Sequence, residues 1–156
     1  MAKSKKQKKK KIGGPFLTCA TFCDAIIEEA DGVLSAMKMI DTVKILLSPN
    51  APADIPSEQN PVGIVQHLLV TFKSGDSPGK HKLQLIMEGP SGKKVEVMNK
   101  DIELSRKPHG GLNIKTQCRI AVQNSGLRWL DVVLDGKVFS RVPINIIISR
   151  TIDPTK

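Results

Sequence analysis

Apolar and polar residues alternate along much of the chain, in short segments that end at turn signals. The most regular segment runs from Leu112 to Gln123, where Leu, Ile, Thr, Cys and Val occupy the even positions. A period of two is typical of a β-strand that buries one face. The same pattern predicts strands over 63–73, 81–88 and 93–104, and a change of parity in the last one predicts a bulge near Asn99 and Lys100.

The stretch from Gly126 to Ser149 predicts a closing hairpin around Asp135-Gly136. This dipeptide favours a type I′ turn, in which both central residues have positive φ. A two-residue turn would give the cross-strand pairs Leu127–Ile144, Trp129–Val142 and Val133–Val138. We therefore predict an apolar core face with the only tryptophan at its centre.

Asp131 is the exception on this predicted face, where it would lie opposite Ser140. A carboxylate that faces a core must be hydrogen-bonded or ion-paired. Ser140, a neighbouring cation or an exposed strand end would satisfy it. A lone catalytic acid is the competing interpretation, but the sequence shows no second carboxylate or base to accompany it.

The segments 16–29 and 33–47 predict a second hairpin, which turns at Ala30-Asp31-Gly32. A helix over Val33–Leu47 is the alternative, because that segment also contains good helix formers. The segment 16–29 has apolar residues at both parities, which predicts a strand buried on both faces.

Residues 48–61 predict a surface crossover from one sheet to the other. Four of the ten prolines lie here, with few residues to bury. Long connections often carry contact surfaces, so this crossover is also a candidate for binding a partner.

Eight short strands without a convincing long helix predict an all-β fold, namely an antiparallel immunoglobulin-like, Greek-key β-sandwich. A chain of 156 residues can bury one substantial core. We predict a disordered lysine-rich tail over 1–14, a single sandwich domain over 15–150 and a C-terminal tail over 151–156.

The positive charge of the chain is concentrated in the N-terminal tail. The formal net charge is +9, and seven of these charges come from lysines in the first eleven residues, which leaves +2 for the rest. These candidate binding residues are Lys3, Lys5, Lys6, Lys8, Lys9, Lys10 and Lys11. A run of like charges is consistent with a solubilising arm, a nucleic-acid or anionic-surface arm, or a nuclear import signal.

The cysteines indicate a reducing compartment. Their number, three, is odd, and the charged N-terminus lacks the apolar stretch of a secretory signal. Cys19 and Cys23 would lie about 13 Å apart on a strand, too far to share one metal ion. We expect them and Cys118 to be buried small hydrophobic residues, and we predict a cytoplasmic protein with no metal, no cofactor and no membrane span.

The sequence offers no catalytic constellation. The three histidines, His67, His81 and His109, are scattered. Pro108-His109-Gly110-Gly111 is similar to an esterase oxyanion loop, but the nucleophile motif Gly-x-Ser-x-Gly is absent. Residues 75–81 are one residue short of a phosphate loop and lead into a strand. We predict no enzyme and no catalytic residue; only the convergence of His67, His109 and Asp131 in one pocket would revise this.

Several turn and core positions form a pattern that resembles a family of bacterial β-sandwich domains of unknown function. The matching segments are Ala30-Asp31-Gly32-Val33-Leu34-Ser35, Gly79-x-His81-x-Leu83-x-Leu85, Pro90-x-Gly92, Gly126-Leu-x-Trp129 and Leu134-Asp135-Gly136. The resemblance covers most of residues 16–149. It implies the sandwich fold and no particular activity.

We therefore expect a non-enzymatic binding or assembly module that contacts a protein partner through loops or strand edges. Strand-edge pairing would also permit a homo-oligomer. The alternative function is the binding of nucleic acid or an anionic surface through the lysine tail.

Overall fold

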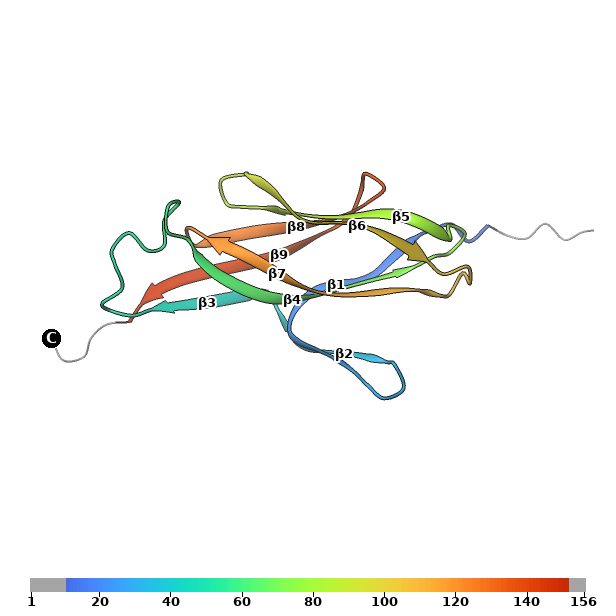
Figure 1. Ribbon diagram of the computed structural model, residues 1–156, viewed down its shortest axis with the longest axis horizontal. Coiled ribbons are helices and arrows are strands. Elements are labelled where there is room, and N and C mark those ends of the chain that lie inside the picture. The colour runs from blue at the N-terminus through green and yellow to red at the C-terminus, as the bar shows by residue number, and fades with distance from the viewer. Residues whose placement is uncertain (1–10, 152–156) are drawn as a thin grey trace, which may run out of the picture.

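Nine β-strands form the protein in the computed structural model (Figure 1). The structure describes residues 11–151. In chain order the strands are β1 (Phe16–Glu28), β2 (Leu34–Ile40), β3 (Thr42–Leu47), β4 (Val62–Lys73), β5 (Gly79–Glu88), β6 (Lys94–Leu104), β7 (Gly111–Val122), β8 (Gly126–Leu134) and β9 (Lys137–Arg150). No helix occurs in this part of the chain, so none that could cross a membrane is found there. The all-β prediction is confirmed.

The strands form two sheets. One has four antiparallel strands in the order β2-β1-β4-β7, and the other has five in the order β3-β9-β8-β5-β6. In the second sheet β3 runs parallel to β9. The prediction of a wholly antiparallel fold is therefore wrong at this strand pair.

The segment 33–47 is neither a helix nor one continuous strand. Leu34–Ile40 pairs with β1, whereas Thr42–Leu47 pairs with β9 in the other sheet. The chain changes sheet at Asp41, whose carbonyl oxygen accepts a hydrogen bond from the Asn145 amide at 2.7 Å. Regular alternation continues across this point, which is why the sequence predicts one strand where the structure has two.

The core lies between the two sheets, since its buried side chains come from both. Phe22, Leu68, Val70 and Phe72 project from the four-stranded sheet, and Leu83, Leu85, Leu130, Ile144 and Ile146 from the five-stranded one. The predicted inward positions of β7 are confirmed: Cys118, Ile120 and Val122 are buried, and Leu112, Ile114 and Thr116 are half-buried. Phe22 and Cys23 are both fully buried, so β1 is covered on both faces there.

The closing hairpin turns at Asp135-Gly136, as predicted, with φ of +50° and +77°. The predicted pair Val133–Val138 is also present, but a bulge follows and shifts the register by one residue. Consequently Trp129 lies opposite Pro143, and Leu130 lies opposite Val142. A one-residue shift exchanges the two faces of a strand.

This shift overturns the predicted core face of β8. Leu130, Val132 and Leu134 are buried in the core, whereas Trp129 is half-buried on the other face. Leu127 and Val138, both expected inside, are 44% and 50% exposed. The physical reason is the β-bulge, which inserts one residue into β9 beside the turn.

The crossover 48–61 connects β3 of the five-stranded sheet to β4 of the four-stranded sheet, which confirms its predicted course. The Arg150 guanidinium anchors it by donating to the carbonyl oxygens of Ala51, Pro52 and Ile55 at 2.6–2.8 Å.

The predicted irregularity of β6 is present but lies at Val97 rather than at Asn99 and Lys100. Leu85 pairs with Met98 and Ile86 pairs with Glu96, so Val97 is the extra residue.

Part of the predicted tail belongs to the folded body. The Asp76 carboxylate accepts hydrogen bonds from the amides of Ile12 and Gly13, and Ser77 donates to the Gly14 carbonyl oxygen at 3.1 Å. Residues 12–14, which the sequence analysis places in the tail, therefore contact the β4–β5 loop. Residues 1–10 and 152–156 lie outside the described part.

Candidate functional site

The β1–β2 hairpin projects beyond the rest of the first sheet, and we call residues 24–39 the hairpin arm (Figure 1). Pairing between β1 and β4 ends at Cys23, while β1 and β2 stay paired as far as Glu28 and Leu34. Since β2 ends the strand order of its sheet, its outer edge has no neighbouring strand among residues 11–151. Such an edge presents backbone groups that can pair with another strand.

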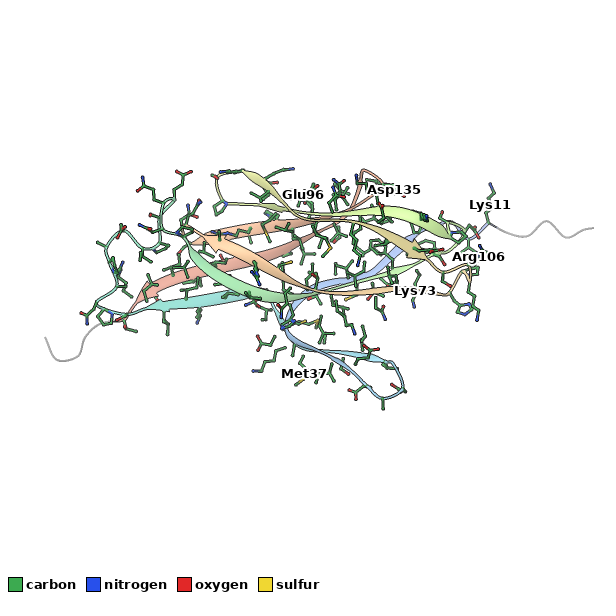
Figure 2. The ribbon with its side chains drawn as sticks, viewed as in Figure 1. Lys11, Met37, Lys73, Glu96, Arg106 and Asp135 are labelled. Atoms are coloured by element: carbon green, nitrogen blue, oxygen red, sulfur yellow. The ribbon has the colours of Figure 1, made fainter. Side chains whose placement is uncertain are left out.

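One face of the hairpin arm is apolar and exposed. Ala25 pairs with Met37 and Cys23 with Met39, which puts both methionines on the same face as Ile27. Met39 is 75% exposed and Met37 46%. Figure 2 shows Met37 on the projecting hairpin, away from the core between the sheets. Methionine adapts to varied partners, and exposed apolar patches of this kind are typical of interaction sites.

The tip of the hairpin arm is acidic. Glu29 accepts a hydrogen bond from the Ser35 hydroxyl at 3.2 Å, and Asp31 accepts one from the Val33 amide at 3.0 Å. Glu28 forms an ion pair with Lys115 on β7. The ion pair links the arm to the outer face of the first sheet. The apolar face of the arm thus ends, at its tip, in the carboxylates of Glu29 and Asp31.

A cleft opens between β6 and β7, which are edge strands of the two different sheets. It has a volume of about 220 Å³. Val95, Val97 and Ile120 supply apolar walls, while Lys93 and Arg119 contribute cations. Gly126 has a φ of +137°, and a Cβ there would lie 3.0 Å from the side chain of Pro90. Glycine therefore allows the β7–β8 turn to pack against the β5–β6 turn beside the cleft.

Arg128 lies in this cleft and is only 3% exposed. It shares the inward face of β8 with Leu130 and lies opposite Ile144. Its guanidinium donates to the carbonyl oxygens of Gly126 and Asn124 at 3.1 and 2.9 Å. Arg128 is not among the residues singled out from the sequence, because the unshifted register of the closing hairpin places it on the outer face.

Asp131 is part of an ion network on the outer face of the second sheet, instead of lying inside opposite Ser140. Arg141 Nε donates to Asp131 Oδ1 at 2.6 Å, and Arg141 Nη2 to Glu88 Oε2 at 2.5 Å. Lys94 Nζ lies 3.5 Å from Glu88 and 3.7 Å from Asp131. The bond to Asp131 raises the pKa of Arg141. The network balances two carboxylates with two cations, and Arg141 also lies 5.5 Å from the Trp129 ring.

The three histidines occupy separate places and do not converge with Asp131. His67, on β4, lines a shallow hollow with Ile26 and Lys115. His109 lies in the loop before β7. His81 Nδ1 lies 2.6 Å from Asp135 Oδ2, and its Nε2 lies 3.0 Å from the Ser77 carbonyl oxygen. His67, His109 and Asp131 therefore come from three different elements, namely β4, the β6–β7 loop and β8.

Asp135 gives the closing hairpin a pH-dependent contact. The Lys82 amide donates to its carboxylate at 2.8 Å, and this bond, followed by that to His81, lowers the pKa of Asp135. A lowered pKa stabilises the fold above the unfolded-state value, about 3.9, and the gain is lost as the pH falls through the folded-state pKa. We expect Asp135→Asn to cost less than about 1 kcal/mol near pH 7, because the carboxylate is more than half exposed.

Urea unfolding of both proteins at about pH 7 and about pH 3 checks this expectation, since the difference should shrink in acid. Asparagine also tolerates the positive φ of this turn, so a difference that persists unchanged at acidic pH would contradict the role of the charge.

The prediction that the cysteines are buried is confirmed for two of the three. Cys23 and Cys118 are buried, and Cys19 is half-buried. Burial raises the pKa of the Cys118 thiol to about 11, and burial together with Asp24 and Cys19 raises that of Cys23. No group of three metal-ligating side chains occurs within residues 11–151.

Of the predicted lysines, only Lys11 lies within the described residues. Figure 2 shows Lys11 at the same end of the molecule as Lys73 and Arg106. The loops there are tied together, because the Ser74 hydroxyl donates to the Lys107 carbonyl oxygen at 2.7 Å. Lys3, Lys5, Lys6, Lys8, Lys9 and Lys10 lie outside the described residues.

Comparison with solved structures finds likenesses at low sequence identity. An alkylpurine DNA glycosylase, AlkC, from Pseudomonas fluorescens is 8% identical, with a TM-score of 0.41 over 68% of this chain and 27% of that one. A β-glucosidase from Listeria innocua is 12% identical, with a TM-score of 0.45 over 72% of this chain and 15% of that one. The chain thus spans a minor part of either enzyme, and neither likeness bears on its function.

No curated protein sequence matches this chain. A family model does match, over residues 18–147, and it covers every strand described above in whole or in large part. The match agrees with the resemblance to a family of unknown function noted in the sequence. This protein belongs to the family of unknown function DUF6941.

Proposed function

We propose that this protein is a non-enzymatic binding and assembly module that receives an extended segment of a partner protein on the hairpin arm. The observation that carries the proposal is the exposed apolar face of Met37 and Met39 beside the outer edge of β2, which ends the strand order within residues 11–151. An extended peptide that pairs with such an edge forms main-chain hydrogen bonds with it, and the alternate side chains of the peptide provide the specificity.

The residues of the arm indicate which side chains a partner segment should carry. The partner segment needs apolar side chains at alternate positions, because Met37, Met39 and Ile27 share one face. It also needs a basic residue near the acidic tip, where Glu29 and Asp31 lie. A second copy of this chain qualifies only if it presents such a segment.

Site-specific photo-cross-linking in cells that naturally express the protein tests this function. A photoreactive residue at position 39 should give a discrete cross-linked product, and peptide mapping should place the link in an alternating apolar segment. Met37→Glu should remove the product, because a charge in the apolar contact must be desolvated.

Position 138 provides the matched control, since Val138 is 50% exposed on the hairpin that joins β8 and β9. The same product from positions 39 and 138, or no product from position 39, would exclude the arm as the binding surface.

The topology further supports an immunoglobulin-like sandwich with Greek-key connections. The chain passes between the sheets from β4 to β5, from β6 to β7 and from β7 to β8. Hairpins within one sheet join β5 to β6 and β8 to β9. This mixture of hairpins and crossings is typical of immunoglobulin-like domains.

The free thiols support the cytoplasm as the location of the protein, because disulfides are rare in reducing compartments.

The second candidate function is the binding of nucleic acid or another anionic polymer through the lysine tail. The observation in its favour is that Lys11, the last residue of the lysine run, lies at the same end of the molecule as Lys73 and Arg106 (Figure 2). Fluorescence anisotropy with labelled DNA and RNA should show salt-sensitive binding that is lost when residues 1–10 are deleted. Absent binding, or binding that survives the deletion, would refute this function.

A further inference from the structure

Arg128 is a buried cation whose recorded partners are all neutral. Beside the carbonyl oxygens of Gly126 and Asn124, its third contact is Asn124 Oδ1 at 3.5 Å. None of the ion pairs within residues 11–151 includes it. A guanidinium stays charged in proteins, so this charge persists inside the fold.

Burial of such a charge is costly unless an anion compensates it. Burial lowers the pKa of Arg128, which reflects the loss of hydration. These contacts use at most three of the five N–H hydrogens of the guanidinium, so it can donate to a further acceptor. An anion that enters the cleft would supply the missing opposite charge.

The surrounding cleft combines cations with apolar walls. Lys93 and Arg119 add positive charge, and neither takes part in an ion pair among the described residues. Val95, Val97 and Ile120 present aliphatic side chains to the same space. At about 220 Å³ the cleft is smaller than ligand pockets of roughly 300–1,000 Å³, which limits an occupant to compact molecules.

We propose that this cleft binds a compact organic acid, with its carboxylate on Arg128 and its aliphatic body against Val95, Val97 and Ile120. Arginine binds carboxylates through paired N–H donors, which favours a carboxylate over a neutral polar group. This site is separate from the hairpin arm, so it extends the proposed function and does not rest on it.

Titration of the full chain with hexanoate, followed by backbone amide NMR shifts, tests the site. Saturable shifts should appear over 93–97 and 119–128, whereas hexanamide, which has the same length but no charge, should produce none. Arg128→Met retains an unbranched side chain but removes the guanidinium and its charge, and should weaken hexanoate binding about tenfold or more.

Arg119→Gln provides a second variant at an exposed position, in case Arg128→Met does not fold, and it should also weaken binding. Arg106 lies in the β6–β7 loop and does not line the cleft, so Arg106→Gln should leave the affinity unchanged. The proposal is overturned if hexanoate causes no saturable shift, if Arg119→Gln and a folded Arg128→Met bind normally, or if inorganic phosphate binds as tightly as hexanoate.

Discussion

Replacement of Phe72 by alanine should lower the free energy of unfolding by about 3–5 kcal/mol, a typical cost for a buried phenylalanine. Phe72 is fully buried on β4, and its ring meets that of Phe139 on β9 edge to face, with centroids 5.8 Å apart. Because β4 and β9 belong to different sheets, this contact joins the two layers directly. Truncation therefore leaves a cavity where the sheets meet.

Phe16→Ala is the matched control, because Phe16 lies on β1 and is 43% exposed. Urea unfolding at equilibrium should show a much smaller loss for this variant, at a similar dependence on urea concentration. Equal losses for the two variants would contradict the position of the core between the sheets.

Gly111→Ala should lower the free energy of unfolding by about 4 kcal/mol or prevent folding, which is far more than an ordinary surface substitution costs. A Cβ at this position would lie 1.8 Å from the Phe72 carbonyl oxygen and 2.9 Å from the Phe72 carbonyl carbon. Both are backbone atoms of the neighbouring strand, so no change of side-chain rotamer can relieve the overlap. The β4–β7 pair would have to separate locally.

Gly63→Ala tests the other end of the same strand pair. Gly63 lies opposite Ala121, and an added Cβ there meets no atom within 4 Å. We expect this variant to stay within about 1 kcal/mol of the wild type, because alanine also restricts the unfolded chain. Thermal melts of both variants make the comparison, and a tolerated Gly111→Ala would contradict the register of β4 and β7.

Local patterns predicted much of this fold. The even positions of β7 face inward as the alternation indicates, and Asp135-Gly136 forms the predicted turn. Both features depend on neighbouring residues alone. The parallel pairing of β3 with β9 could not be predicted in this way, because it depends on where a strand over 33–47 leaves one sheet for the other.

The candidate sites were less accessible to sequence reasoning. A single bulge in the closing hairpin moves Trp129 outward and Arg128 inward, and alternation cannot reveal it because both faces of β8 carry apolar residues. The exposure of Met37 and Met39 follows from the length of β1 beyond its pairing with β4, which is a property of the sheet. Alternation in the sequence does not distinguish such an exposed apolar face from a buried one.

Hydrogen exchange would show whether the outer edge of β2 receives a partner strand. The protein alone would be compared with the same protein in the complex purified from its native cells. The alternate amides of Leu34–Ile40 that point away from β1 should gain protection in the complex, because an added strand accepts their hydrogen bonds. Protection that rises along β3, β6 or β7 instead, with β2 unchanged, would contradict this expectation.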